Sequence, residues 1–130
     1  MAEVAGHRNI TLYTLSEIKE LSGEPGNFKV KILKYPRYVD EKCTGCGLCE
    51  EVCPIEIPNE FDMGLGLRKA IYVPFPQAVP QTRVIDMEHC IKCRTCFGKC
   101  KVKAIDYDMQ PEEVEVNVGS IIVATGYKEF

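Results

Sequence analysis

The sequence predicts an α+β fold in which a cysteine-rich centre is flanked by antiparallel β-strands. Two cysteine runs with the same internal spacing occupy the middle of the 130-residue chain. Stretches of alternating apolar residues, separated by glycine and proline turn signals, precede and follow these runs, and such stretches are typical of strands. A chain of this length can bury a hydrophobic core without disulfides, since roughly two-thirds of the unfolded surface is buried at this size. We expect three segments: residues 1–37, 38–108 and 109–130.

The first segment is predicted to be a β-hairpin. Residues 9–15 and residues 28–33 have strand-like patterns, and a glycine- and proline-rich turn signal lies between them at residues 23–27. Residues 16–21 either add a third strand to a meander or begin a helical turn, and the sequence leaves both open. Residues 37–40 are expected to form a short strand that leads into the first cysteine loop.

The two cysteine runs carry the chemistry. Each has the spacing C-x2-C-x2-C-x3-C, which is that of bacterial two-cluster ferredoxins, where a run gives three thiolates to one 4Fe-4S cluster and its fourth cysteine to the other. Three cysteines at this spacing can wrap around one cluster, whereas the fourth follows a turn that leads away. We therefore expect one cluster to be bound by Cys43, Cys46, Cys49 and Cys100, and the other by Cys90, Cys93, Cys96 and Cys53.

The loop residues fit this role better in the first run than in the second. Gly45 and Gly47 leave room for backbone N–H groups to turn towards sulfur, and Pro54 ends the loop after the fourth cysteine. The second run has Arg94 where the first has Gly47, and Lys101 replaces the proline. The second loop is therefore expected to be less regular.

Other uses of cysteine fit the pattern less well. Structural zinc favours two separated C-x-x-C pairs, a disulfide framework belongs to exported proteins, and no βαβ unit surrounds a dithiol pair. A Rieske centre needs two histidine ligands, but His89 is next to Cys90 while His7 is remote in sequence. We expect His89 to be solvated or to cap a turn, and Tyr72, Tyr107 and the phenylalanines Phe61, Phe75 and Phe97 to pack around the clusters.

Composition and charge exclude several functional classes. The chain is 45% hydrophobic and 27% charged, as soluble globular proteins are. A net charge of −3 disfavours nucleic-acid binding. The chain has no apolar run long enough to cross a membrane and no apolar leader segment at its beginning, so we expect a cytoplasmic protein without membrane insertion.

The remaining segments suggest an internal duplication and further strands. Residues 84–86 repeat the lead-in pattern of residues 38–40, and the proline-rich residues 74–80 are expected to form an ordered cover between the runs. Strands are predicted at residues 70–73, 104–107, 113–118 and 121–126, the last of them apolar and therefore expected to be buried.

Taken together, these residues resemble the A subunit of heterodisulfide reductase, an iron–sulfur flavoprotein of anaerobes. The resemblance runs from residues 7–12 through both cysteine runs to residues 121–126, which are similar to the Ala-Thr-Gly strand of thioredoxin-reductase-like flavoproteins. It implies that a two-cluster ferredoxin domain is inserted between strands of a flavoprotein. It also implies electron transfer, with other subunits of the reductase complex or redox proteins as partners.

The dinucleotide fingerprint G-x-G-x-x-G is absent, because Gly64 and Gly66 have no third glycine at the required place. We therefore expect FAD only in the full-length parent protein, of which this chain is a segment or a shortened form. The chain is not expected to be catalytic alone. A free-standing ferredoxin and, less favoured, a zinc-bound structural module are the alternative functions.

The two runs also differ in charge. Residues 43–62 include five acidic and no basic residues, whereas residues 90–105 include five basic and no acidic ones. Because positive charge favours the more negative, reduced cluster, we expect the cluster of the second run to have the higher potential. The alternative is that these charges are solvated and screened, which leaves the two potentials alike.

Overall fold

The computed structural model of the chain describes residues 2–126. These residues divide into two compact units. One contains the residues up to Thr14 together with Pro36–Gln110, and the other contains Leu15–Tyr35 together with the residues from Pro111 onward. The expected first segment, residues 1–37, is thus divided between the two units. We call them the cysteine unit and the sheet unit.

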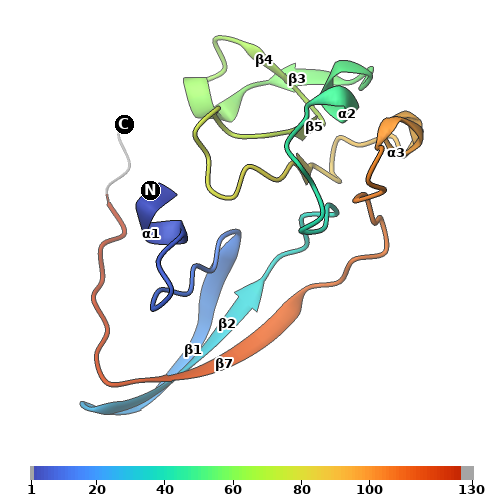
Figure 1. The fold of residues 1–130 in the computed structure, drawn as a ribbon. Helices are drawn as coiled ribbons and strands as arrows, with labels where there is room; N and C mark the ends of the chain where they lie inside the picture. Colours follow the sequence, from blue (N-terminus) through green and yellow to red (C-terminus); the bar gives the residue numbers. More distant parts are fainter. Residues whose placement is uncertain (1, 127–130) are drawn as a thin grey trace. The chain divides into compact units, whose positions relative to one another are not determined.

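The sheet unit is a three-stranded antiparallel sheet (Figure 1). Its strands are β1 (Ser16–Glu24), β2 (Asn27–Lys34) and β7 (Glu112–Val118), in the order β1-β2-β7. Pro25 and Gly26 form the tight turn between β1 and β2, and Gly26 N–H donates to the Gly119 carbonyl at 2.9 Å. The central strand β2 supplies the buried side chains Val30 and Leu33. The strands predicted around residues 28–33 and 113–118 are therefore confirmed.

The first strand of the hairpin is displaced from its predicted position. Residues 9–15 form no strand, so that prediction is wrong. Residues 16–21 belong to β1, so the strand alternative is confirmed for them and the helical turn is not. The tight turn pairs Glu24 with Asn27, and this register carries the ladder back to Ser16 opposite Lys34. The nine residues of β1 are mostly exposed and lack an alternating apolar pattern. Pairing with β2, rather than local alternation, determines where this strand lies.

The apolar segment at residues 121–126 is not a buried strand. It has no regular structure, and the Ile122 and Val123 side chains are 91% and 77% exposed. A strand needs a hydrogen-bonded neighbour, and no ladder in the described residues includes this segment. The prediction of a buried strand is therefore wrong for the chain as it stands.

The cysteine unit consists of short elements around one core. Its helices are α1 (Ala2–Ala5), α2 (Leu48–Glu51), the 3₁₀ turn η1 (Glu60–Asp62) and α3 (Thr95–Lys99). Two small antiparallel sheets pair β3 (Glu56–Pro58) with β4 (Leu67–Lys69) and β5 (Ile71–Tyr72) with β6 (Val84–Ile85). The buried side chains of the core are Val39, Cys49, Ile71, Ile85, Cys96, Ala104 and Ile105. Cysteines of both runs therefore belong to the same core.

Two aspartates occupy matching positions ahead of the two cysteine runs. Asp40 N–H donates to the Ala104 carbonyl at 2.7 Å, and Asp86 N–H donates to the Ala70 carbonyl at 2.8 Å. Each aspartate carbonyl then accepts a hydrogen bond from the first cysteine of the following run, at 3.2 Å from Cys43 N–H and 2.9 Å from Cys90 N–H. This repeat supports the internal duplication expected from the sequence.

The helices in the described residues are all short. None of them has the length and apolar character needed to cross a lipid bilayer.

Candidate metal centre

The first cysteine loop owes its path to two glycines. Gly45 and Gly47 have φ angles of +71° and +83°, in the left-handed region that side chains disfavour. A Cβ placed on Gly47 would lie 3.3 Å from Arg83 Nη2, and one on Gly45 would lie 3.3 Å from the Gln81 carbonyl oxygen. The glycines therefore permit both the turn and the close approach of residues 81–83. Gly47 then caps α2, which carries Cys49.

The second cysteine loop follows the same path without glycine. Lys92 and Arg94, the counterparts of Gly45 and Gly47, have φ angles of +54° and +60°. Arg94 is the N-cap of α3 as Gly47 is of α2, and α3 carries Cys96 as α2 carries Cys49. The expectation of a less regular second loop is therefore wrong. A left-handed conformation costs a residue with a side chain about 1–2 kcal/mol, so other interactions of this loop must offset the strain.

Four cysteine side chains from the two runs meet at one pocket. Its cysteines are Cys53 of the first run and Cys90, Cys93 and Cys96 of the second. Cys53 is remote in sequence from the other three, so the fold, and not the spacing, brings it there. The remaining walls are mostly apolar and are formed by Pro54, Ile55, Ala70, Ile71, Ile85, Ile91 and Tyr107.

This pocket suits an iron–sulfur cluster by its donor set. Four thiols can each ligate one iron of a cubane cluster. Burial raises the pKa of the Cys96 thiol, although a hydrogen bond with Tyr107 opposes this effect. A thiolate at this depth therefore needs positive charge beside it, which bound iron supplies. The apolar walls keep water away from such a group.

Hydroxyl groups contact the sulfurs of this pocket. The Tyr107 hydroxyl oxygen lies 3.1 Å from Cys96 Sγ. The Thr95 hydroxyl donates to Cys93 Sγ at 3.4 Å, and this bond lowers the pKa of the exposed Cys93 thiol. Hydrogen bonds of this kind stabilise negative charge on sulfur.

The other expected ligands are partly gathered. Cys49 is buried in the core, and Cys43 and Cys100 pack against it, whereas Cys46 is exposed and lies outside this core. Burial raises the pKa of the Cys49 thiol to about 11, with the positive charge of Arg83 acting in the opposite direction. Cys100 Sγ accepts a hydrogen bond from Ala104 N–H at 3.3 Å. Three of these four cysteines thus share one core.

Comparison with known proteins agrees with this interpretation of the cysteines. Residues 42–105 match the family of 4Fe-4S dicluster domains. The chain is 60% identical over its full length to the A-type iron–sulfur subunit of the CoB–CoM heterodisulfide reductase of Methanocaldococcus jannaschii. The whole chain is a relative of heterodisulfide reductase A subunits.

Two further A subunits show how wide this similarity is. The chain is 62% identical, over 98% of its length, to the second A-type iron–sulfur subunit of the CoB–CoM heterodisulfide reductase of Methanopyrus kandleri. It is 49% identical, over its full length, to the A subunit of the ferredoxin:CoB–CoM heterodisulfide reductase of Methanosarcina mazei. The chain covers 20% of the length of the Methanopyrus protein and 17% of the Methanosarcina protein, so it corresponds to one segment of these relatives.

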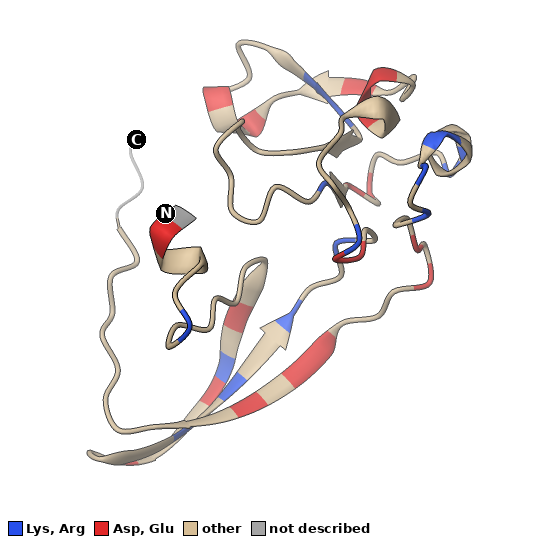
Figure 2. Ribbon diagram, viewed as in Figure 1, with Lys and Arg blue, Asp and Glu red and all other residues tan. Residues whose placement is uncertain are grey.

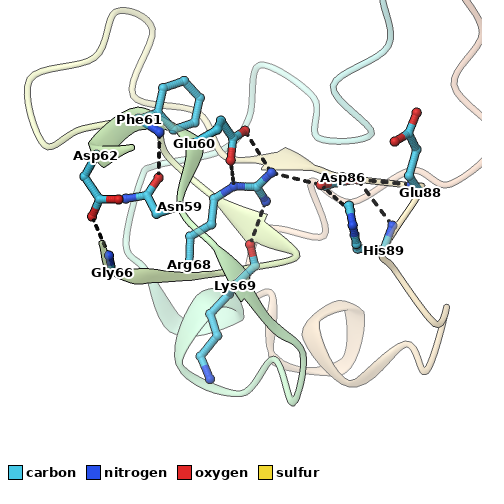
Figure 3. A network of polar contacts seen from close by, with 10 residues as sticks. All are labelled: Asn59, Glu60, Phe61, Asp62, Gly66, Arg68, Lys69, Asp86, Glu88 and His89. Carbon is cyan, nitrogen blue, oxygen red and sulfur yellow. Dashed lines mark hydrogen bonds and ion pairs between the residues drawn. The ribbon is translucent and has the colours of Figure 1, made fainter. Parts of the chain in front are cut away.

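His89 takes part in an ion-pair network beside the second run (Figure 3). Its Nδ1 lies 2.9 Å from an Asp86 carboxylate oxygen, which also accepts a hydrogen bond from Arg68 Nη2 at 2.9 Å. Arg68 additionally pairs with Glu60 and stacks on the Tyr72 ring at 4.0 Å. Burial alone would raise the pKa of Asp86, but the hydrogen bonds from Arg68 and His89 hold it below its ordinary value. His89 therefore anchors the turn before Cys90.

The aromatic side chains are only partly where the sequence predicted them. Tyr107 packs against the core and contacts a cysteine. Phe61, Phe75 and Phe97 are each about half exposed, and their packing around the clusters stays a prediction. Phe61 is on η1, Phe97 is on α3, and Phe75 is in the loop between β5 and β6.

Acidic residues near the first run form ion pairs with basic residues from later in the chain. Figure 2 marks the acidic and basic residues along the ribbon. Near the first run, Glu50, Glu56 and Glu60 pair with Arg83, Lys69 and Arg68, all from later in the chain. Near the second run, the five basic residues are exposed, and within residues 2–126 none of them forms an ion pair. The negative charge of residues 43–62 is therefore partly neutralised by basic residues that follow this segment in the chain.

Proposed function

We propose that this chain carries electrons through two 4Fe-4S clusters with crossed ligation. One cluster is bound by Cys43, Cys46, Cys49 and Cys100, and the other by Cys90, Cys93, Cys96 and Cys53. The observation that carries this assignment is the pocket that Cys53 shares with the three leading cysteines of the second run. The match to 4Fe-4S dicluster domains supports the nature of the cofactor.

A bound 4Fe-4S cluster can take up and release one electron, with a potential that its surroundings set. The side chains of this unit supply those surroundings. Ile71 and Ile85 are buried beside the pocket and exclude water. The Tyr107 hydroxyl lies beside the sulfur of Cys96 and can donate to it when that sulfur is a thiolate. The Ala104 N–H donates to the sulfur of Cys100, so each proposed ligand set has one such contact. Cys49 and Cys96 share one core, so the packing of one ligand set is coupled to that of the other.

The chain is proposed to serve as the electron-carrying segment of a longer, cytoplasmic reductase. The similarity over the full chain to A subunits of heterodisulfide reductases supports this role. Its partners would then be the other subunits of a heterodisulfide reductase complex or separate redox proteins. We further propose that the sheet unit belongs to a thioredoxin-reductase-like flavoprotein domain, with FAD bound by other parts of that protein.

Metal analysis tests the proposed cofactor. The chain is purified without oxygen, and iron, sulfide and zinc are measured per chain. Two clusters give about eight irons and about eight sulfides, together with brown colour and an electron paramagnetic resonance (EPR) signal on reduction. Stoichiometric zinc without iron would contradict the proposal and support the structural zinc module.

A pair of cysteine variants tests the crossing. Cys53→Ala is expected to disturb the cluster of the second run, and Cys100→Ala the cluster of the first run. Single variants of Cys46 and Cys93 identify the EPR signal of each cluster, since neither residue is the crossing cysteine. If Cys53→Ala abolishes the same signal as Cys46→Ala, each run binds its own cluster and the crossed assignment is wrong.

A further inference from the structure

Arg83 lies outside both cysteine runs, yet it contacts the first one. It immediately precedes β6, and its side chain is only 12% exposed. Nε donates to the Glu50 carboxylate at 3.1 Å, and Nη1 donates to the Gln81 carbonyl at 3.4 Å. Glu50 directly follows Cys49 on α2. The small β5–β6 sheet is thereby tied to the helix that carries a proposed cluster ligand.

The guanidinium also fills the space beside the loop backbone. Its Nη2 is 3.3 Å from the point where a Cβ on Gly47 would lie, and its Nη1 is 3.8 Å from the corresponding point at Gly45. Because neither glycine has a side chain, the planar cation can approach the backbone of residues 45–47. Arg83 therefore supports the first loop at the two positions where φ is positive.

The same geometry places a positive charge against the loop and helix that carry Cys46 and Cys49. A guanidinium stays charged at all accessible pH values, and here it is largely buried, where screening by water and salt is weak. Its carboxylate partner Glu50 is more exposed, at 34%. Inside the unit, the electrostatic potential of the Arg83 guanidinium is therefore screened less than that of the Glu50 carboxylate.

We propose that Arg83 is a positioning residue that holds the loop of residues 43–49 and raises the reduction potential of the cluster bound there. This inference rests on the proposed ligation of that cluster. Reduction adds negative charge to the cluster, so a nearby cation stabilises the reduced state more than the oxidised one. Arg83 would thereby narrow the difference in potential that the acidic first run and the basic second run would otherwise produce.

The test compares Arg83→Gln with Arg83→Lys, which keeps the charge, and with Arg8→Gln, which makes the same substitution at an exposed site. Each chain is purified anaerobically with its clusters, iron is counted, and EPR-monitored redox titration gives both potentials. The EPR signal that is lost in Cys46→Ala identifies the first-run cluster. We expect Arg83→Gln to lower that potential by about 59 mV, which is a tenfold change in the ratio of reduced to oxidised cluster for one electron.

Arg83→Lys should recover a large part of the shift, while Arg8→Gln should leave both potentials unchanged. An unchanged first-run potential in Arg83→Gln, or an equal shift of both clusters, would overturn the inference. If Arg83→Gln does not retain the cluster, Glu50→Gln replaces it in the test. This variant keeps the guanidinium and removes the negative charge beside it, so we expect it to raise the potential of the first-run cluster. An unchanged potential in Glu50→Gln would overturn the inference. A wild-type chain without iron would instead count against the proposed function.

Discussion

The hydrogen bond between Tyr107 and Cys96 leads to a quantitative prediction for Tyr107→Phe. The substitution removes one hydroxyl whose oxygen lies 3.1 Å from Cys96 Sγ and leaves the ring packed against the core. A hydrogen bond to a charged acceptor contributes about 1.5–3 kcal/mol. The total charge of a four-cysteine cluster changes from about −2 to about −3 on reduction. About a third of the hydrogen-bond energy in the reduced state is therefore gained on reduction.

This third amounts to about 0.5–1 kcal/mol in favour of the reduced cluster. At 1.36 kcal/mol for each tenfold change, and 59 mV for the same change with one electron, the loss is about 20–45 mV. We therefore expect Tyr107→Phe to lower the potential of the second-run cluster by this amount, measured by EPR-monitored titration.

Tyr38→Phe is the matched control, since Tyr38 packs against the same core. In residues 2–126 its hydroxyl has no hydrogen bond to a cysteine sulfur. A Tyr107→Phe chain with full iron content and an unchanged potential would refute the reasoning. So would a shift confined to the first-run cluster, since Tyr107 lines the pocket of the other proposed ligand set.

Three further predictions concern the loops, the ion pairs and the clusters. Gly47→Ala should destabilise the chain with bound clusters by about 1–3 kcal/mol in thermal unfolding, because it strains a positive φ and displaces Arg83. Arg94→Gly at the matching position should retain both clusters. Equal losses of stability in the two variants would contradict the shared loop path. Arg68→Met should lower the free energy of unfolding by about 3 kcal/mol in urea, because it leaves the largely buried Asp86 without its cation. The exposed pair Lys31–Glu20 is the control, and Lys31→Met should cost less than about 1 kcal/mol; similar costs at the two sites would show that burial does not matter here. Removal of iron by chelation should greatly speed hydrogen exchange in residues 43–53 and 90–100 while the amides of β2 stay protected, and equal loss in both units would show that they unfold together.

Local sequence patterns were enough to predict the features that depend on few neighbours. The cysteine spacing indicates the cofactor because a cluster needs closely spaced thiolates on one loop. The strands β2 and β7 alternate polar and apolar residues over most of their length, from residue 27 to 32 and from residue 113 to 118, which is typical of a half-buried strand. The close relatives and the dicluster domain agree with the cofactor and with the recognised family.

The features that were missed depend on contacts between distant residues. Residues 9–15 alternate as well as a strand does, but the turn at Pro25 and Gly26 assigns the partner of β2 to residues 16–24. Arg83 is remote in sequence from Glu50, and no local pattern indicates that its charge belongs beside the first cysteine loop. A count of charges along the sequence therefore makes the surroundings of the first cysteine loop more acidic than they are in the folded chain. Only the fold reveals which basic residues reach it.

The pairing of β2 with β7 has a consequence for how such a protein can be assembled. Lys34 at the end of β2 lies opposite Glu112 at the start of β7, and their side chains form an ion pair at 2.6 Å. Everything between these two residues, including all eight cysteines, is therefore an insertion that leaves and re-enters the sheet at neighbouring backbone positions. A short hairpin turn could bridge the same two residues without altering the strand register. We therefore expect a chain in which such a turn replaces residues 35–111 to keep the pairing of β2 with β7.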